Sequence, residues 1–429
     1  MNCYLLRYAE IGLKSNQTRK RWLEILRKNI QRGLFWIGAG YDRVVIVQGR
    51  LLLYSDDKRV EDVLAHTFGL VSYSPAEEFD ADIEEIKSRA IELYKQEDPS
   101  TFRVTTQRVT KNFEMTSIEI NYCVGEAVYE CGGKVDLTGY DLNIGIEIIN
   151  ERAYIFSESF KCPGGLPLGV QGGGCAIIRD YRDFVSALLF MKRGCNADLI
   201  VVRSSMCSNY IDILQGYAFM GLRILLVDEE WELGAAMAVF SKEGTEIFVS
   251  GVLLKECPGT NLCPCELYSE DHLERSINGC NLNVIPMPAR DFKISAGCVI
   301  YYNDTVLLLR RKEEKTWAFP KGGVDNMEFF RQAAIREACE ESGSCSLEIL
   351  EYVGKSHYSA RDKEGPFTKD VYYYLCETKR NDVSLEYLFD SYTFLPQPEA
   401  KELLSFENDK IIIEEAERIR KHIKRNVKQ

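Results

Sequence analysis

The stretch GGVDNMEFFRQAAIREACEESGS, residues 322–344, places three carboxylates near the end of one predicted helix. Its pattern predicts that the helix runs over 327–342. Glu337 and Glu341 then share one face, and Glu340 lies beside them. Like charges at this spacing, close to a helix C-terminus, cost from a few tenths to about 1 kcal/mol each. A bound divalent cation would make the clustered carboxylates favourable instead of costly. The alternative to a cation site is a solvated acidic helix end.

The spacing of fixed residues in this stretch resembles the signature box of the Nudix hydrolases. It matches the glycines, the single glutamate, the Arg-Glu pair and the Glu-Glu pair of that box, and departs from it at Ser344, where a bulky aliphatic residue is usual. The resemblance implies that Mg²⁺ or Mn²⁺ is held by Glu337, Glu340 and Glu341 together with the Gly322 carbonyl. It also implies that Glu328 and Arg336 tie the loop to the helix.

The preceding segment CVIYYNDTVLLLRRKEEKTWAFPKGGVD, residues 298–325, is similar to the diadenosine-tetraphosphate hydrolase branch of that family. The resemblance implies attack of water on a phosphoanhydride phosphorus, with a carboxylate taking the proton; which carboxylate does so stays open. Candidate phosphate clamps are Arg310, Arg311 and Lys321, with exposed solubilising charge as the alternative for each. Trp317 is expected in the core rather than stacked on a base.

The chain as a whole has 429 residues and a formal charge of −12. This length predicts three or four domains, and this charge argues against a generally basic surface without excluding a local basic patch. No run of apolar residues approaches the length of a membrane span, and no leader pattern opens the sequence. The fifteen cysteines follow no repeating framework. We therefore expect a soluble cytoplasmic protein with reduced thiols and no membrane partner.

The first 195 residues carry a second resemblance. LLRYAEIGLKSNQTRKRW (5–22) resembles the ferredoxin-like domain of the tRNA 4-thiouridine synthetases, and FRVTTQRVTKNFEMTSIEINYCVGEAV (102–128) resembles their THUMP domain. The resemblance implies a grip on tRNA, with no DNA partner, through phosphate contacts that weaken with salt. The alternative is a solvated basic helix face. The candidate RNA contacts are Lys14, Arg19, Lys20, Arg21, Arg103, Arg108 and Lys111.

The third region departs from the synthetase pattern where that family binds the pyrophosphate of ATP. The family carries a Ser-Gly-Gly-x-Asp-Ser loop there, but this chain reads RDYRDF over 179–184 and retains only Asp183. No glycine remains to let backbone amides approach a phosphate. We expect a degenerate PP-loop fold that performs neither adenylation nor sulfur transfer.

Four cysteines later in this region, Cys257, Cys263, Cys265 and Cys280, could supply a tetrahedral zinc site. Their spacing lacks a clean C-x₂-C pair, so free or packing thiols are the preferred interpretation, and a redox pair is a further alternative.

These observations predict a multidomain protein of mixed α/β and α+β class. Its expected domains are a ferredoxin-like domain (1–75), a THUMP domain (76–168), a Rossmann-like degenerate PP-loop domain (169–288) and a Nudix α/β/α sandwich (289–429). The expected function is Mg²⁺-dependent hydrolysis of a dinucleoside polyphosphate, a nucleotide or an RNA 5′ end, in a chain whose N-terminal part binds tRNA. A non-catalytic RNA-binding protein is the alternative, and a tRNA-thiolating enzyme is disfavoured by the lost loop.

Overall fold

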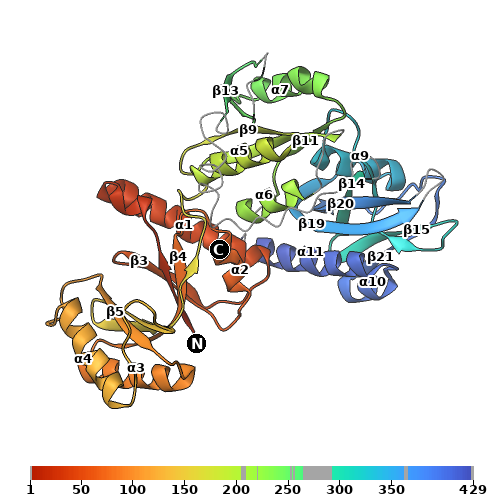
Figure 1. Ribbon diagram of the computed structural model, residues 1–429. Coiled ribbons are helices and arrows are strands. Elements are labelled where there is room, and N and C mark those ends of the chain that lie inside the picture. Colours follow the sequence, from red (N-terminus) through yellow and green to blue (C-terminus); the bar gives the residue numbers. More distant parts are fainter. Residues whose placement is uncertain are drawn as a thin grey trace. The chain divides into compact units, whose positions relative to one another are not determined.

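The computed structural model describes residues 2–203, 209–219, 221–251, 254, 257–263, 292–361 and 366–426. Contacts between Cα atoms divide the chain into two compact units, which are described separately. The first comprises residues up to Gly172 together with Met191–Cys195, and the second contains the remaining described residues. Figure 1 shows the elements of both units in chain order.

The first unit is built on one eight-stranded sheet, all of it within residues 2–172, with strand order β2-β3-β1-β4-β7-β6-β5 and β8 paired to β4. Helix α1 begins after Ser15, whose side chain accepts a hydrogen bond from the Thr18 amide. The hairpin between β6 and β7 turns at Asn150, which has a φ of 55°. The bounds are β1 Cys3–Arg7, η1 Glu10–Leu13, α1 Asn16–Trp36, β2 Arg43–Val47, β3 Arg50–Tyr54, α2 Val60–Ala65, β4 Ser72–Asp80, α3 Ile83–Glu97, β5 Phe102–Arg108, α4 Ser117–Glu130, β6 Leu142–Ile149, β7 Arg152–Phe156 and β8 Phe160–Lys161.

The central part of the chain, which we call the central region (173–263), alternates strands and helices, and its strands are parallel as the sequence predicts. The sheet order is β13-β12-β9-β10-β11, and it continues into a strand of the next region, β18. Buried aliphatic strands pack against α7 to form the core. The bounds are β9 Gly173–Ile178, α5 Tyr181–Lys192, β10 Asn196–Val202, α6 Tyr210–Ala218, β11 Ile224–Val227, η3 Glu230–Glu232, α7 Leu233–Lys242, β12 Ile247–Val249 and β13 Thr260–Leu262.

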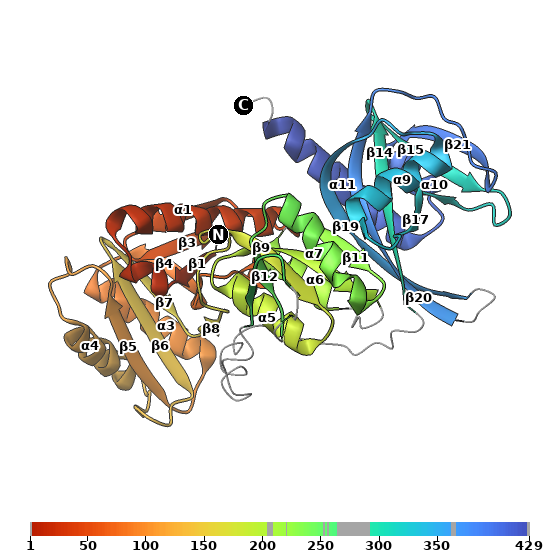
Figure 2. The same cartoon turned by 90° about the horizontal axis from the view of Figure 1, so that it is seen from above.

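The C-terminal region (292–426) is a mixed sheet of order β16-β15-β14-β20-β19 with α9 and α11 packed on it, as Figure 2 shows from above. Long β14 and β20 run parallel through its buried centre. The bounds are β14 Phe292–Tyr302, β15 Thr305–Arg311, β16 Trp317–Ala318, β17 Lys321–Gly323, β18 Glu328–Phe329, α9 Phe330–Ser342, β19 Glu348–Arg361, β20 Pro366–Thr378, β21 Phe389–Pro396, α10 Gln397–Leu403 and α11 Glu407–Asn426.

The glutamate-bearing helix differs from the expected one at its start. The sequence predicts a helix from Met327, but α9 begins at Phe330 because Glu328 and Phe329 form β18 and Met327 has a φ of 59°. The predicted end is right, since Gly343 adopts the left-handed conformation (φ 71°) that stops a helix. Along the described part of the chain, no helix has the length and hydropathy to cross a membrane.

Candidate active site

Two of the box glutamates meet the backbone of β17. The Glu341 carboxylate accepts a hydrogen bond from the Lys321 amide at 2.9 Å. The Glu337 carboxylate lies against Gly322, where any Cβ would overlap it. These residues are on consecutive turns of α9, so the helix period brings both carboxylates to the same short strand. The glycine is therefore required by the close approach of a carboxylate to the chain.

Arg336 is the hub that links the loop before α9 to its glutamates. Its guanidinium donates to Glu328 at 2.9 and 2.8 Å, to Glu337 at 2.7 Å and to Glu340 at 3.2 Å. It also donates to the Gly323 carbonyl at 2.7 Å. The structure thus brings Glu328, Arg336 and Glu337 together in the arrangement that the box resemblance implies, while Glu340 stays on the exposed side of the helix.

Burial sets the protonation of the two inner glutamates. It raises the pKa of Glu341 to about 7, and it also raises the pKa of the Glu337 carboxyl. Arg311 and Lys321 oppose the rise at Glu341. A carboxylate that is desolvated to this degree near neutral pH is a candidate for binding a cation or exchanging a proton.

Lys369 on β20 also faces these glutamates, although it is not among the residues that the sequence predicts for the site. Its burial, reinforced by Lys321 and Arg311, lowers its pKa to about 8, and Glu337 and Glu341 partly oppose the fall. The tyrosines that follow it on the same strand are buried in the core. The signal that could have identified Lys369 is a single cation at the start of an otherwise buried run.

The three predicted phosphate clamps lie in the same region, but they differ in the contacts that they already make. Arg310 is paired with Asp390 at 2.7 Å, and Lys321 is paired with the buried Asp409 at 3.2 Å. Arg311 lies over the ring of Phe389. Their role as clamps stays a prediction.

The donor set fits a hard divalent cation, which the family resemblance implies. The buried Glu341 carboxylate, the partly buried Glu337 carboxylate and the backbone of Gly322 bring oxygen donors together, and burial raises the pKa of both carboxyls. In the described ranges, however, no three His, Cys, Asp or Glu side chains are gathered tightly enough to hold an ion, and Arg336 donates to both Glu337 and Glu340.

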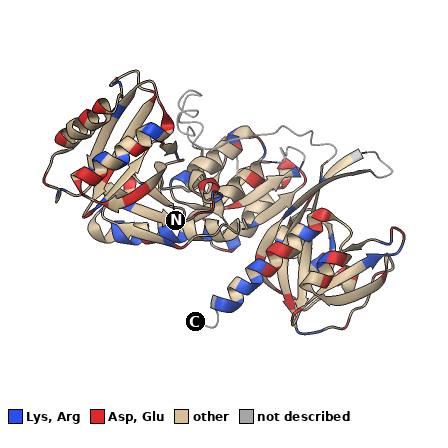
Figure 3. Ribbon diagram, turned by 90° about the horizontal axis from the view of Figure 1, so that it is seen from below, with Lys and Arg blue, Asp and Glu red and all other residues tan. Residues whose placement is uncertain are grey.

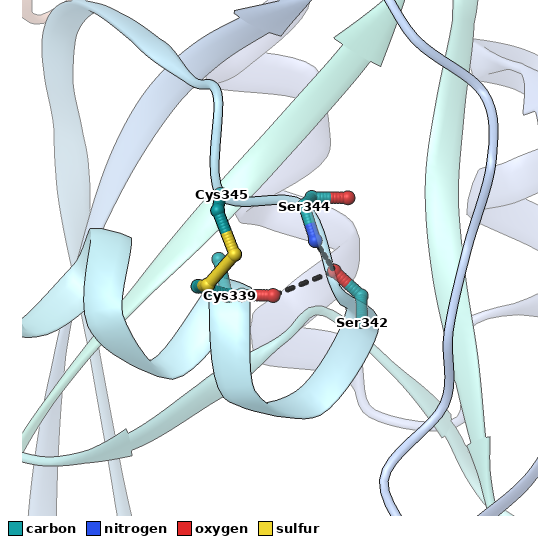
Figure 4. The surroundings of a disulfide bond; sticks show 5 residues. Cys339, Ser342, Ser344 and Cys345 are labelled. Carbon is teal, nitrogen blue, oxygen red and sulfur yellow. Dashed lines mark hydrogen bonds between the residues drawn. A yellow bond between two sulfur atoms is a disulfide. The ribbon is translucent and has the colours of Figure 1, made fainter.

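A disulfide closes the end of this helix, shown in Figure 4. Cys339, on α9, is bonded to Cys345, with a Cα–Cα distance of 4.4 Å. Between them, the Ser344 amide donates to the Ser342 hydroxyl at 3.3 Å. The expectation that all thiols are reduced is therefore wrong for this pair, because the left-handed Gly343 folds the chain back by the right amount.

The degenerate loop of the central region contains its own anion. Asp183 is fully buried and accepts hydrogen bonds from the Arg179 amide at 3.0 Å, from the Arg179 side chain at 2.6 and 3.0 Å, and from the Gly251 amide at 2.5 Å. Asp180 caps the following helix by accepting from the Asp183 amide. The amides of Arg179, Asp183 and Gly251 are thus already partnered.

The predicted RNA contacts fall on two elements of the first unit. Lys and Arg residues recur along α1, coloured blue in Figure 3, and Lys14, Lys20 and Arg21 are exposed. Arg19 instead donates to carbonyls of Gly12 and Lys14. Near β5, Arg103 stacks on Tyr140 and bonds Asn143, Arg108 bonds the Phe113 carbonyl, and Lys111 is exposed.

The predicted zinc cysteines can be placed only in part. Cys257 packs against the core of the central region, and Cys263 is buried with its thiol 3.3 Å from the Asn261 side chain. Cys265 and Cys280 lie outside the described residues. Zinc at these positions stays a prediction.

Comparison with known proteins defines the class of each part. Residues 291–414 match the model of the NUDIX domain, residues 80–158 that of the THUMP domain, and residues 3–74 that of the ThiI ferredoxin-like domain. The chain thus carries a Nudix domain behind a ThiI-type ferredoxin-like domain, a THUMP domain and a PP-loop-like central region, as its sequence predicts.

Curated proteins that resemble the chain match about half of its length. A probable tRNA sulfurtransferase of Methanocaldococcus jannaschii is 43% identical over 215 residues, covering 47% of this chain and 56% of that protein. A probable tRNA sulfurtransferase of Thermococcus kodakarensis is 40% identical over 203 residues, with 45% and 53% coverage. The chain spans about half the length of the curated relatives that it matches.

Two solved structures resemble the chain over about two thirds of its length. The crystal structure of PH1313 from Pyrococcus horikoshii has a TM-score of 0.56 and 29% identity, covering 64% of this chain and 98% of that one. A 4-thiouridine synthetase solved with RNA and bound ATP has a TM-score of 0.50 and 20% identity, covering 65% and 85%. The second likeness shows a shared fold alone.

Proposed function

We propose that the C-terminal domain hydrolyses a phosphoanhydride bond of a nucleotide-type substrate, in a chain whose N-terminal domains bind tRNA. The observation that carries the first half is the convergence of the partly buried Glu337 and the buried Glu341 on the β17 backbone beside Lys369. The substrate classes are those that share a bridging phosphate: a dinucleoside polyphosphate, a free nucleotide or a pyrophosphate on an RNA 5′ end.

Each group in the site has a task in this reaction. Glu337, Glu340 and Glu341, with the Gly322 carbonyl, would hold Mg²⁺ or Mn²⁺, which when bound supplies charge neutralisation and water activation. Arg336 orients Glu337 through a direct hydrogen bond and fixes Glu328 at the other side of the loop. Lys369, Arg311 and Lys321 offer positive charge to the substrate phosphates. A box glutamate or a nearby loop carboxylate takes the proton of the attacking water.

A substrate panel tests the hydrolase. Release of phosphate or nucleotide would be measured with and without Mg²⁺ for the wild type, Glu341→Gln and the matched exposed control Glu402→Gln. We expect Mg²⁺-dependent turnover that falls at least about a hundredfold in Glu341→Gln and is unchanged in Glu402→Gln. Equal turnover in all three proteins would remove the proposal. No turnover on any substrate, with tRNA binding intact, would favour the non-catalytic alternative.

The proposal that the first unit binds tRNA is supported by the THUMP match and by the exposed cations of α1. Phosphate contacts release counterions, so affinity should fall steeply with salt. The charge reversal Lys20→Glu with Arg21→Glu should weaken filter retention of tRNA and flatten its salt dependence. The control pair Lys379→Glu with Arg380→Glu reverses exposed charges in the Nudix domain and should leave both unchanged. Retention that ignores salt and the first pair would contradict RNA binding by α1.

We also propose that the chain performs no ATP-dependent adenylation. The support is the buried Asp183 carboxylate, which already accepts hydrogen bonds from the Arg179 amide and side chain, just before α5, and from the Gly251 amide. A second anion at this place would meet like charge and would find these donors already partnered.

A further inference from the structure

The loop that precedes α9 in the Nudix domain is built into the sheet of the central region. Strand β18 pairs antiparallel with β11, so that Leu225 faces Phe329 and Leu226 faces Glu328. The Met327 amide adds a hydrogen bond to the Leu226 carbonyl at 2.8 Å. A segment of the signature box thus serves as the edge strand of a neighbouring domain.

The side chains of this loop also enter the neighbouring core. Met327 and Phe329 pack against the buried cluster formed by the strands and α7 of the central region. Phe329 meets Phe240 edge to face at 5.4 Å, and Arg223 lies over the Phe329 ring. The left-handed Met327 holds a conformation that residues with a Cβ rarely adopt, and this packing keeps it there.

Polar contacts fix the tip of the loop on the same domain. Arg203 donates to the Val324 carbonyl at 2.7 Å and to Asp228 at 2.8 Å. The Asn326 side chain accepts from the Asp228 amide at 2.9 Å and donates to Glu232. The loop is therefore held by its backbone, its apolar side chains and its one amide side chain.

A second contact fixes the β19 side of the Nudix domain to the central region. Lys355 of β19 donates to Asp212 of α6 at 2.6 Å and to the fully buried Asp370 at 2.6 Å. A Cβ at Gly221 would collide with Tyr352 of the same strand. The two regions are thus joined at two separate places, which limits rotation of one against the other.

The anchored loop leads directly into the candidate active site. It begins at Gly323, whose carbonyl receives Arg336, and it ends at Glu328, whose carboxylate receives the same guanidinium twice. A shift of the segment between them would move Glu328, and Arg336 would carry that shift to Glu337. The placement of a candidate cation ligand therefore depends on a domain that contributes no group to the chemistry.

We propose that Arg203 and Asn326 are positioning residues for the Nudix site, and that the degenerate PP-loop domain holds the signature loop in the conformation that the site requires. The inference rests on the proposed hydrolase function. Arg203 acts through the Val324 carbonyl, and Asn326 acts through Glu232 and the Asp228 amide. Partners that orient metal-site residues from outside typically matter about 10- to 100-fold for metal affinity or rate.

The test compares the full-length wild type with Arg203→Met, Arg203→Lys, Asn326→Ala and the control Arg193→Met, which removes an exposed ion pair in the first unit. The measurements are Mn²⁺ affinity by calorimetry, hydrogen exchange of amides 322–330, kcat and KM on the best panel substrate, and the melting temperature. For Arg203→Met and Asn326→Ala we expect Mn²⁺ affinity and kcat to fall about tenfold, faster exchange confined to the loop, and a KM close to that of the wild type. Arg203→Lys keeps a donor for the carbonyl and should recover part of the loss, whereas Arg193→Met should match the wild type.

The outcomes separate this inference from the function beneath it. If Mn²⁺ affinity and kcat are unchanged while the melting temperature falls, the contacts are packing alone and the positioning role is overturned. If no substrate is cleaved but Mn²⁺ affinity falls in Arg203→Met and Asn326→Ala, the positioning role stands and the hydrolase proposal fails. If the wild type neither binds Mn²⁺ nor turns over, both fail. Should Arg203→Met not fold, Asn326→Ala decides the question by the same readings.

Discussion

At the scale of single residues, the site depends on carboxylates placed where water is scarce. Glu341 has only the Lys321 amide as a hydrogen-bond donor among the partners described for its carboxylate, and burial raises its pKa to about 7. Glu337 is half-compensated by Arg336. The sequence places these two glutamates on one helix face, because their spacing reflects the helix period. It could not reveal that Arg310 and Lys321 are already paired, since Asp390 and Asp409 are distant in the chain.

The raised pKa of Glu341 predicts how pH acts on metal binding and on stability. The folded-state pKa of about 7 lies above the ordinary value of 4.5, so its contribution to the stability of the metal-free protein is full below about pH 4.5 and is lost as pH rises through about 7. Mg²⁺ needs the carboxylate, so its affinity should rise up to about pH 7 and then level off. Calorimetry in buffers of different ionisation enthalpy should detect proton release on binding at about pH 6 and little at about pH 8. Proton release that persists in Glu341→Gln would contradict this assignment.

At the scale of elements, the local pattern predicted the end of the glutamate helix but misplaced its start. Met327, Phe329 and Phe330 have the apolar spacing of a helix, yet the first two point into the core of the central region and only Phe330 begins α9. The competing partner, β11, lies about a hundred residues earlier in the sequence. A local pattern cannot detect such a partner, whereas Ser15 and Gly343 were readable because a helix end is fixed by its neighbours in sequence.

The approach of α9 to β17 predicts the effect of one methyl group. Gly322→Ala would place a Cβ where the Glu337 carboxylate lies, so the strand and the helix must separate or the carboxylate must turn away. We expect Mn²⁺ affinity to fall by roughly tenfold or more and the protein to lose about 1–3 kcal/mol of stability. Gly323→Ala is the matched control, since the space around Gly323 is open. Equal Mn²⁺ titrations for the two variants would refute the tight contact.

The disulfide at the end of α9 predicts a redox-dependent melting temperature. The bond joins residues six apart, so the chain-entropy model gives it a stabilisation of about 2 kcal/mol. Cys345→Ser should lower the melting temperature under non-reducing conditions and make no difference once a thiol reductant is present. A variant that melts with the wild type in both conditions would indicate that the bond does not form in solution.

At the scale of the whole molecule, the central region and the Nudix domain share one set of core contacts and fall within one compact unit. The sequence predicted both folds and drew a boundary between them at residue 288. That boundary stays a prediction, and it separates two regions whose sheets are joined by β18. The resemblance to known folds identifies each domain individually. It carries no information on β18, a strand of one domain that pairs with the sheet of the other.

Shared core contacts predict joint unfolding. Phe240 is fully buried and touches Phe329, so Phe240→Ala should cost about 3–5 kcal/mol and lower the calorimetric transition of the Nudix domain together with that of the central region. Phe102→Ala removes an equally buried ring from the core of the first unit and should leave that transition in place. Two transitions that move independently when Phe240 is truncated would show that the two cores are separate.

The buried pair of Arg179 and Asp183 has a consequence for how the central region responds to its surroundings. A domain that binds a free anion such as a nucleotide becomes more stable as the concentration of that anion rises. Here the anion is the Asp183 carboxylate, which lies four residues from Arg179 in the same chain, so its effective concentration is fixed. The contact is therefore made at every ATP concentration, and we expect millimolar ATP to leave the thermal transition of this region unmoved.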